Sequence, residues 1–211
     1  MSDPSSARAE LQQIAIPSVS AVGSCSVLAI DFETATASRA SPCAVGLCWL
    51  DEGAVIGRAY RLIRPPGNDF APFNIAFHGI GPGDVANAPE FPVLWEELLP
   101  HLPGALLLAH NASFDISVLR RTLDIYGLPW PDLSYFCTML GARRVWPDLA
   151  NHKLNTVARH LGFSFRHHHA GEDAEACGRI AVGQMAAVGV KDPMMLAPAI
   201  GMQLGRLHRN G

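Results

Sequence analysis

The hydrophobic residues in the first third of this 211-residue chain fall into short runs that predict strands. Residues 26–33 form an apolar, partly β-branched run that ends in Asp-Phe-Glu, and two further apolar runs follow at 44–50 and 54–63. Short connections join the runs, and one of them, Asp51-Glu-Gly53, is typical of a tight turn. We therefore expect three strands in an antiparallel meander.

Beyond residue 65 the pattern changes to alternating helices and strands. A short helix is expected at 92–99, followed by an almost wholly apolar strand at 105–110, which is the composition of a strand buried on both faces. Further helices are predicted at 114–126, 138–145, 154–161 and 171–188, with a brief strand at 133–137 and a last amphipathic piece at 194–204. This order indicates an α/β fold with a mixed sheet flanked by helices.

Composition narrows the class of protein. A hydrophobic content of 49% and a charged content of 17% exclude wholesale disorder and a coiled coil. The net charge of −3 excludes a protein that coats nucleic acid generally, so a phosphate partner must meet a local site. No apolar run reaches the ~18 residues of a membrane span. Five cysteines without a Cys-x-x-Cys pair indicate buried, reduced thiols and a cytoplasmic location.

Two carboxylates end the first predicted strand. Asp31 and Glu33 are two residues apart, so their side chains share one face of the strand. They lie at its carboxyl end, where open α/β sheets bind ligands. Carboxylates on one face repel each other, and a hard divalent cation such as Mg²⁺ or Mn²⁺ compensates that repulsion. For this pair alone, a solvated strand end is the alternative interpretation.

Two more carboxylates and a histidine open predicted helices. Asp115 and Asp173 each fall in a first helical turn, a position that the helix dipole also favours without any function. His168 precedes Asp173 by five residues, so its imidazole and that carboxylate can face one pocket. The adjacent His167, His168 and His169 are also compatible with a chance polar cluster or a zinc site. A zinc site needs ligands from a second segment, and the chain offers no paired cysteines.

The four carboxylates together predict a reaction. They suit two metal ions about 4 Å apart, which stabilise the attacking and leaving oxygens of a phosphoryl displacement. A histidine with a near-neutral pKa can accept a proton from the attacking water. The pattern therefore predicts metal-dependent phosphodiester hydrolysis.

Three stretches of the chain resemble the motifs of the DEDDh 3′→5′ exonucleases. They are Val27–Ala35 (VLAIDFETA), Ala109–Asp115 (AHNASFD) and His167–Ala174 (HHHAGEDA). The likeness extends over residues 27–181 and is greatest to the proofreading epsilon subunit of bacterial DNA polymerase III and its stand-alone relatives. It implies a ribonuclease-H-like, mixed five-stranded sheet flanked by helices. It also implies an exonuclease domain over 24–190, between a mobile leader (1–23) and a C-terminal helical tail (191–211).

The resemblance also implies residue roles. One metal ion, which binds the attacking water, would be held by Asp31, Glu33 and Asp173. Asp31 would also touch a second ion, and Asp115 would act on that second ion, directly or through water. His168 would be the general base, because the family's base lies five residues before its last Asp. Contacts to the terminal nucleotide are implied for Thr34, Ala35, His78, His110 and Asn111.

Two local details qualify these expectations. Gly171 stands where the family usually has Leu, and we expect it to loosen the loop that carries His168. The neighbours His167 and His169 are expected to face solvent or phosphate, because adjacent side chains on an irregular loop point in different directions.

The sequence thus favours a 3′→5′ exonuclease that uses two Mg²⁺ or Mn²⁺ ions on single-stranded DNA 3′ ends and releases nucleoside monophosphates. A replication or repair protein is a candidate partner, and no membrane association is expected. One alternative is the same chemistry on RNA ends, which depends on whether the pocket tolerates a 2′-hydroxyl. The other is a non-catalytic nucleic-acid-binding module, against which the complete set of carboxylates and histidine argues.

Overall fold

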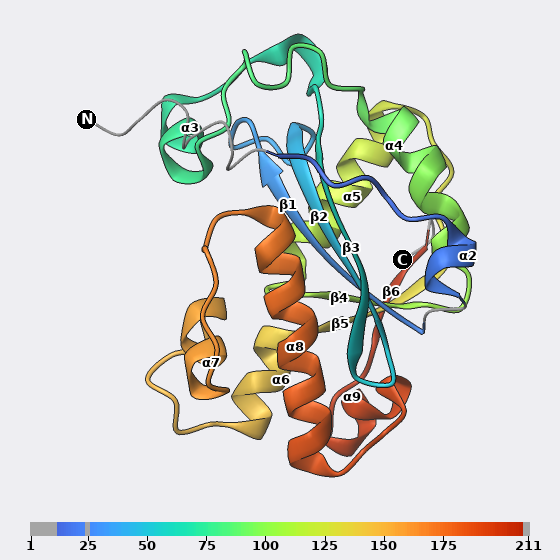
Figure 1. Ribbon diagram of the computed structural model, residues 1–211, viewed down its shortest axis with the longest axis vertical. Helices are drawn as coiled ribbons and strands as arrows, with labels where there is room; N and C mark the ends of the chain where they lie inside the picture. Colours follow the sequence, from blue (N-terminus) through green and yellow to red (C-terminus); the bar gives the residue numbers. More distant parts are fainter. Residues whose placement is uncertain (1–11, 24–25, 209–211) are drawn as a thin grey trace.

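The computed structural model describes residues 12–23 and 26–208, which form a mixed six-stranded sheet in the order β3-β2-β1-β4-β5-β6 (Figure 1). Strands β1 (Val27–Thr34), β2 (Pro42–Asp51) and β3 (Ala54–Leu62) pair antiparallel, which confirms the predicted meander. Strands β4 (Leu106–Ala109) and β5 (Leu133–Cys137) then continue the sheet parallel to β1. The carboxyl ends of β1, β4 and β5 therefore meet at one edge.

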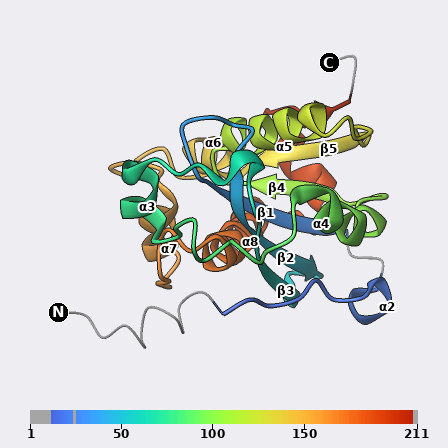
Figure 2. The ribbon, with the colours of Figure 1, turned by 90° about the horizontal axis from the view of Figure 1, so that it is seen from above.

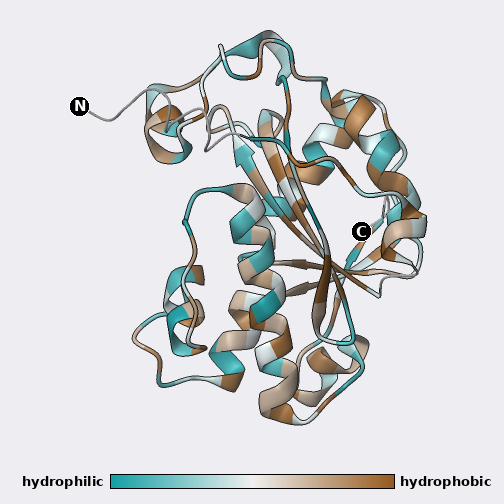
Figure 3. Cartoon of the chain, viewed as in Figure 1, coloured by the Kyte–Doolittle hydropathy of each residue, from teal (hydrophilic) through white to brown (hydrophobic). Residues whose placement is uncertain are grey.

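Helices cover both faces of the sheet, as predicted. Alternate residues of β1, including Leu28, Ile30 and Phe32, pack against α4 (Phe91–Leu98) and α5 (Ser113–Ile125). Its other residues, Val27 and Ala29, face a second core formed with α6 (Thr138–Val145), α7 (Leu154–His160) and α8 (Ala170–Val188). Figure 3 shows the hydrophobic residues concentrated on the central strands and on the helix surfaces turned toward them.

The sixth strand, β6 (Gly205–Leu207), corrects the predicted count of five and lies within residues 191–211, where a helical tail is predicted. It pairs antiparallel with β5, after a 3₁₀ turn (Pro193–Met195) and α9 (Leu196–Ala199). Three residues are too few to show an alternating pattern. Gly205 has no Cβ, and the ring of Tyr135 lies 2.1 Å from where one would stand, so the pairing depends on a contact between distant residues.

The described part of the predicted leader contacts the sheet. The backbone of Ile14 exchanges two hydrogen bonds with Tyr60 of β3, at 2.8 and 2.9 Å, and the Gln13 side chain accepts one from the Leu62 backbone. After these contacts the chain forms the short helix α2 (Val19–Val22), whose Val22 is buried. These residues cover the backbone groups of an edge strand, which sequence patterning does not indicate. Residues 1–11 lie outside the described part of the chain.

A further helix, α3 (Pro72–His78), lies between residues 64 and 91, where the sequence predicts no helix or strand. None of its residues is buried, so it has no amphipathic pattern by which to predict it. A 3₁₀ turn (Pro66–Asn68) precedes it, and another (Leu99–His101) follows α4. Within the described residues, no helix is long and apolar enough to cross a membrane.

Close packing of α8 on the sheet sets the position of its first turn. A Cβ at Gly46 of β2 would lie 1.9 Å from the carbonyl oxygen of Ala170, so only glycine allows the helix to begin there. Gly46 pairs with Asp31 in the sheet register. The start of α8 is therefore held directly beside the end of β1 (Figure 1).

Candidate active site

The structure brings the four predicted carboxylates together at the carboxyl end of β1. The carboxylates of Asp31, Glu33 and Asp173 offer ligand oxygens that all lie within 4.8 Å of one another. Asp115, from the first turn of α5, accepts a 3.0 Å hydrogen bond from the backbone N–H of Phe32, the residue between Asp31 and Glu33. One strand and the first turns of two helices thus build an acidic cluster.

Burial and mutual repulsion make this acidic cluster costly to ionise. Burial, followed by the charges of Asp173 and Asp115, raises the pKa of Glu33 to about 8. Burial raises the pKa of Asp115 to about 7, although its hydrogen bond from Phe32 opposes the shift. The pKa of Asp31 is also raised, first by burial and then by the other three carboxylates. Oxygen ligands that repel one another in this way fit a hard divalent cation.

The loop before α8 places two histidines beside this cluster. His168 has a left-handed backbone (φ 69°), and its N–H donates to Asp173 Oδ2 at 3.1 Å. Its ring lies between the rings of Phe77 and His167, with centroids 3.8 and 3.9 Å away. Burial, followed by the charge of His167, lowers the pKa of His168. This shift favours the neutral imidazole, which is the form that can accept a proton.

The two neighbouring histidines, which are expected to face solvent or phosphate, each have partners within the protein. His167 Nδ1 lies 3.2 Å from Asp173 Oδ1, so it contacts a carboxylate of the acidic cluster. His169 accepts a hydrogen bond from the Glu172 backbone at the start of α8, and its ring stacks on Tyr60 at 4.2 Å. Neither ring faces solvent alone: Asp173 contacts His167, while the start of α8 and the Tyr60 ring hold His169.

Gly171 lies inside α8 rather than in the histidine loop. A Cβ there would approach the Tyr60 Cβ and the His169 ring to 3.2 Å. The stacked pair of Tyr60 and His169 thus occupies the space that a larger side chain at position 171 would need.

Three of the residues implied to contact substrate make contacts within the protein. The Thr34 carbonyl accepts a 2.8 Å hydrogen bond from Asn74 of α3, and it lies 3.2 Å from His78 Nε2. The Ala35 N–H donates to Ser41, and the Ala35 carbonyl accepts from Ala71. These bonds join α3 to the end of β1. Asn74, which the sequence did not single out, is therefore part of the support for the site.

His110 and Asn111 differ in what they offer. His110 is bonded at both ring nitrogens, to Thr138 Oγ1 and to the His152 carbonyl, each at 2.9 Å. Burial lowers the pKa of His110 to about 4, so it is neutral. Asn111 is exposed, has a left-handed backbone (φ 70°) and uses its Oδ1 to accept from Ser113. Of this pair, only Asn111 presents a side chain to solvent at the site.

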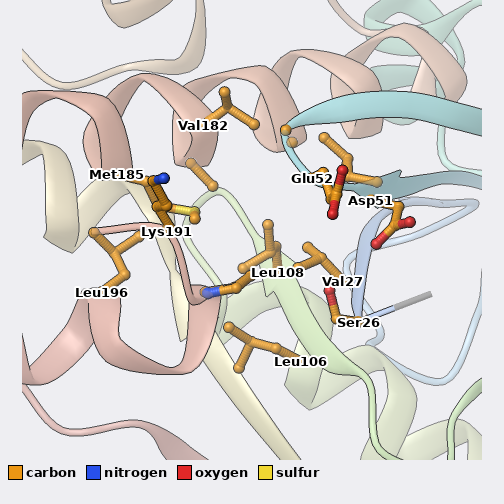
Figure 4. A pocket seen from close by; sticks show the side chains of 15 residues that line it. Ser26, Val27, Asp51, Glu52, Leu106, Leu108, Val182, Met185, Lys191 and Leu196 are labelled. Carbon is orange, nitrogen blue, oxygen red and sulfur yellow. The ribbon is translucent and has the colours of Figure 1, made fainter. Parts of the chain in front are cut away.

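A separate cavity of about 130 Å³ lies at the opposite end of the sheet (Figure 4). Its lining is mainly aliphatic and includes Val27, Leu108 and Val182. Asp51, Glu52 and Lys191 are the charged residues of that lining. Val27 begins β1, whereas the acidic cluster is at the end of β1, so this cavity is not part of the candidate active site.

A mixed sheet flanked by helices, with four carboxylates and a histidine at the carboxyl end of its central strand, has the ribonuclease-H-like architecture. Solved structures of known exonucleases have a similar fold. The solved structure of Exonuclease X in complex with 5′ overhanging duplex DNA has a TM-score of 0.67 at 23% identity, covering 83% of this chain and 99% of that one. The nuclease domain of 3′hExo, a DEDDh family member bound to rAMP, has a TM-score of 0.67 at 18% identity, covering 85% and 95%.

The sequence comparisons give the family. The family model described as exonuclease (RNase_T) matches residues 28–181, so the chain belongs to the exonuclease family. The PolC-type DNA polymerase III of Streptococcus pneumoniae serotype 2 (strain D39 / NCTC 7466) is 30% identical over 130 residues, which are 61% of this chain and 9% of that protein. The chain thus corresponds to less than a tenth of this curated relative. The resemblance to DEDDh exonucleases is confirmed.

Proposed function

We propose that this chain is a 3′→5′ exonuclease that hydrolyses single-stranded DNA ends to nucleoside monophosphates with two Mg²⁺ or Mn²⁺ ions. The observation that carries the proposal is the convergence of Asp31, Glu33 and Asp173 within 4.8 Å, with Asp115 held against the same strand. The ions fit this cluster because its hard oxygen ligands are buried and repel one another.

Each residue of the acidic cluster has a role in this proposal. Asp31, Glu33 and Asp173 would hold one ion, and Asp31 and Asp115 the other. When bound, the ions supply charge stabilisation for the attacking and leaving oxygens of the phosphate.

His168 accepts the proton of the attacking water as the new oxygen–phosphorus bond forms. The bond to the 3′ oxygen of the preceding nucleotide breaks, and that oxygen takes up a proton. Asp173 orients the base through its hydrogen bond to the His168 backbone. Asn111, and Thr34 and Ala35 through their backbone, would contact the terminal nucleotide.

DNA is favoured over RNA as the substrate by the relative of higher identity, a PolC-type DNA polymerase III at 30%. The rAMP-bound 3′hExo structure, at 18% identity, supports RNA ends as the second candidate. By analogy with that polymerase, we propose a replication or repair protein as a partner and a cytoplasmic location.

The deciding experiment compares DNA and RNA strands of the same sequence, labelled at the 3′ end, under single-turnover conditions with saturating Mg²⁺. We expect release of labelled mononucleotide from DNA at the higher rate, and none after addition of EDTA. A faster release from RNA would select the second candidate. Binding of either strand without any metal-dependent release would leave a non-catalytic binding module.

A further inference from the structure

The loop between β1 and β2 presents an arginine beside the acidic cluster. Arg39 is exposed, and its guanidinium carbon lies 4.0 Å above the centre of the Phe114 ring. Phe114 packs against the core and directly precedes Asp115, and the charge of Arg39 reaches that carboxylate and lowers its pKa. Figure 2 shows this loop beside the start of α5. Arg39 therefore lies at the rim of the site.

Arg39 is held differently from the other well-positioned arginines. Among the described residues, its guanidinium has no carboxylate within ion-pair distance and no hydrogen-bond partner, although its charge reaches Asp115. Ion pairs to carboxylates are made by Arg58, Arg61, Arg64, Arg166, Arg179 and Arg206. Arg120 and Arg179 also lie over aromatic rings, but Arg120 donates to the Arg206 carbonyl and Arg179 pairs with Glu175. A guanidinium stacked on an aromatic ring keeps its in-plane N–H groups open, whereas an ion pair occupies them. Arg39 thus offers free donors in a fixed place.

Hydrogen bonds within the loop fix its shape. Ser41 Oγ donates to the Ser38 carbonyl at 2.8 Å, and the Ser38 N–H donates to Thr36 Oγ1 at 3.1 Å. The Ala35 N–H donates to the Ser41 carbonyl at 2.7 Å, which closes the base of the loop. A donor on an ordered loop loses little conformational entropy when it binds a ligand.

We infer that Arg39 binds a backbone phosphate of the substrate strand, on the 5′ side of the phosphodiester that is cleaved. The inference rests on the proposed function. The chain has a net charge of −3 and an acidic cluster at its centre, so a strand that continues past this cluster needs a local cation. A planar guanidinium suits two phosphate oxygens at once.

The test compares two substrates that differ in the upstream phosphate. A single-stranded oligonucleotide has that phosphate, while the p-nitrophenyl ester of thymidine 5′-monophosphate has only the phosphate that is cleaved. For Arg39→Ala we expect KM for the oligonucleotide to rise about 5–10-fold, the scale of one charge-assisted contact, with kcat changed by less than about twofold. Hydrolysis of the ester should change by less than about twofold. The magnitude of the salt slope of log KM should fall by about 0.7, the value for one phosphate on a single strand.

Two further variants sharpen the result. Arg39→Lys should restore the salt slope but only part of the affinity, because an ammonium is a point charge without the planar fork. Arg121→Ala is the matched control, since Arg121 is exposed on the same helix as Phe114 and has no ion pair among the described residues. It should leave KM and the salt slope unchanged.

An unchanged KM and salt slope in Arg39→Ala would overturn the inference. So would an equal loss on both substrates, because Arg39 would then act on the acidic cluster and not on an upstream phosphate. If the wild-type protein hydrolyses neither substrate, the proposed function fails separately. Fluorescence anisotropy with the labelled oligonucleotide then decides the role of Arg39: about 5–10-fold weaker binding by Arg39→Ala supports it, and equal binding refutes it.

Discussion

Replacing Asp31 by asparagine should stabilise the metal-free protein while it abolishes hydrolysis. Asp31 and its neighbours Glu33 and Asp173 have oxygens within 4.8 Å, and all three other acidic-cluster carboxylates raise the pKa of Asp31. Asparagine has nearly the same shape but no charge. The substitution therefore removes repulsion from the folded state, where the carboxylates are close together, and changes little in the unfolded state.

The magnitude follows from Coulomb's law. Two unit charges at the 4.8 Å limit repel by about 3.5 kcal/mol at an effective dielectric constant of 20. Proton uptake by the acidic cluster already relieves part of this repulsion. We therefore expect Asp31→Asn to raise the free energy of unfolding by about 1–3 kcal/mol at mildly alkaline pH. For a chain of this length, each 1 kcal/mol raises Tm by about 2–4 °C.

Thermal unfolding in EDTA, and again in saturating Mg²⁺ or Mn²⁺, measures the stability of the metal-free and the metal-bound protein. The wild-type protein should be the less stable one in EDTA and should gain more from metal, because a ligand stabilises the state that binds it. Activity of the folded variant should fall by at least about 10³-fold. Asp51→Asn is the control, since Asp51 is an exposed carboxylate at the other end of the sheet.

A lower Tm for Asp31→Asn in EDTA would refute the repulsion argument. Equal stabilisation of wild type and variant by metal, or near-normal turnover by the folded variant, would refute the assignment of Asp31 as a shared ligand.

The remaining predictions concern pH, the base and the strand end. Glu33 has a pKa of about 8 in the fold against an ordinary 4.5, so the folded state binds more protons between these values and the metal-free protein should lose stability as pH rises through that window. Urea titrations in EDTA at several pH values test this, and a stability that rises with pH would contradict it. His168→Ala should lose about 10²–10⁴-fold in single-turnover rate while it still binds metal and DNA, whereas His167→Ala and His169→Ala should each lose less than about tenfold. A larger loss in either neighbour would move the base to that residue. Closed circular single strands should resist cleavage, and cutting of circles as fast as linear strands would indicate an endonuclease.

Elements with a strong hydrophobic pattern were predictable from the sequence. The prediction for α6 matches the structure at both ends, and those for β1 and β4 agree to within one residue. The elements that patterning missed are short or lie on the surface. Helix α3 buries no residue, and β6 has three residues whose pairing depends on Gly205 beside Tyr135. Such elements form through contacts with distant residues, which a local pattern does not record.

The acidic cluster was predictable because regular elements, a strand and two helix starts, place its side chains. The alternation of β1 places Asp31 and Glu33 on one face, and a first helical turn fixes Asp115 and Asp173 at the carboxyl edge. No sequence period predicts where the histidine side chains lie. The contact of His167 with Asp173 depends on the left-handed backbone at His168, and the bonds of His110 depend on residues 28 and 42 positions away.

This difference separates two kinds of residue at the site. Side chains placed by a strand or a helix start converge whether or not a ligand is bound, because the backbone of the element fixes them. His78 and His110 lie at the same edge, but their ring nitrogens already bond to the Thr34 and His152 carbonyls. A residue within a motif is thus free to meet substrate only where the fold leaves its polar atoms unpaired. By that criterion two side chains are the first to examine for contacts to the strand. They are Asn111, whose Oδ1 accepts from Ser113 but whose Nδ2 has no bond among the described residues, and Arg39, which lies outside the recognised motifs.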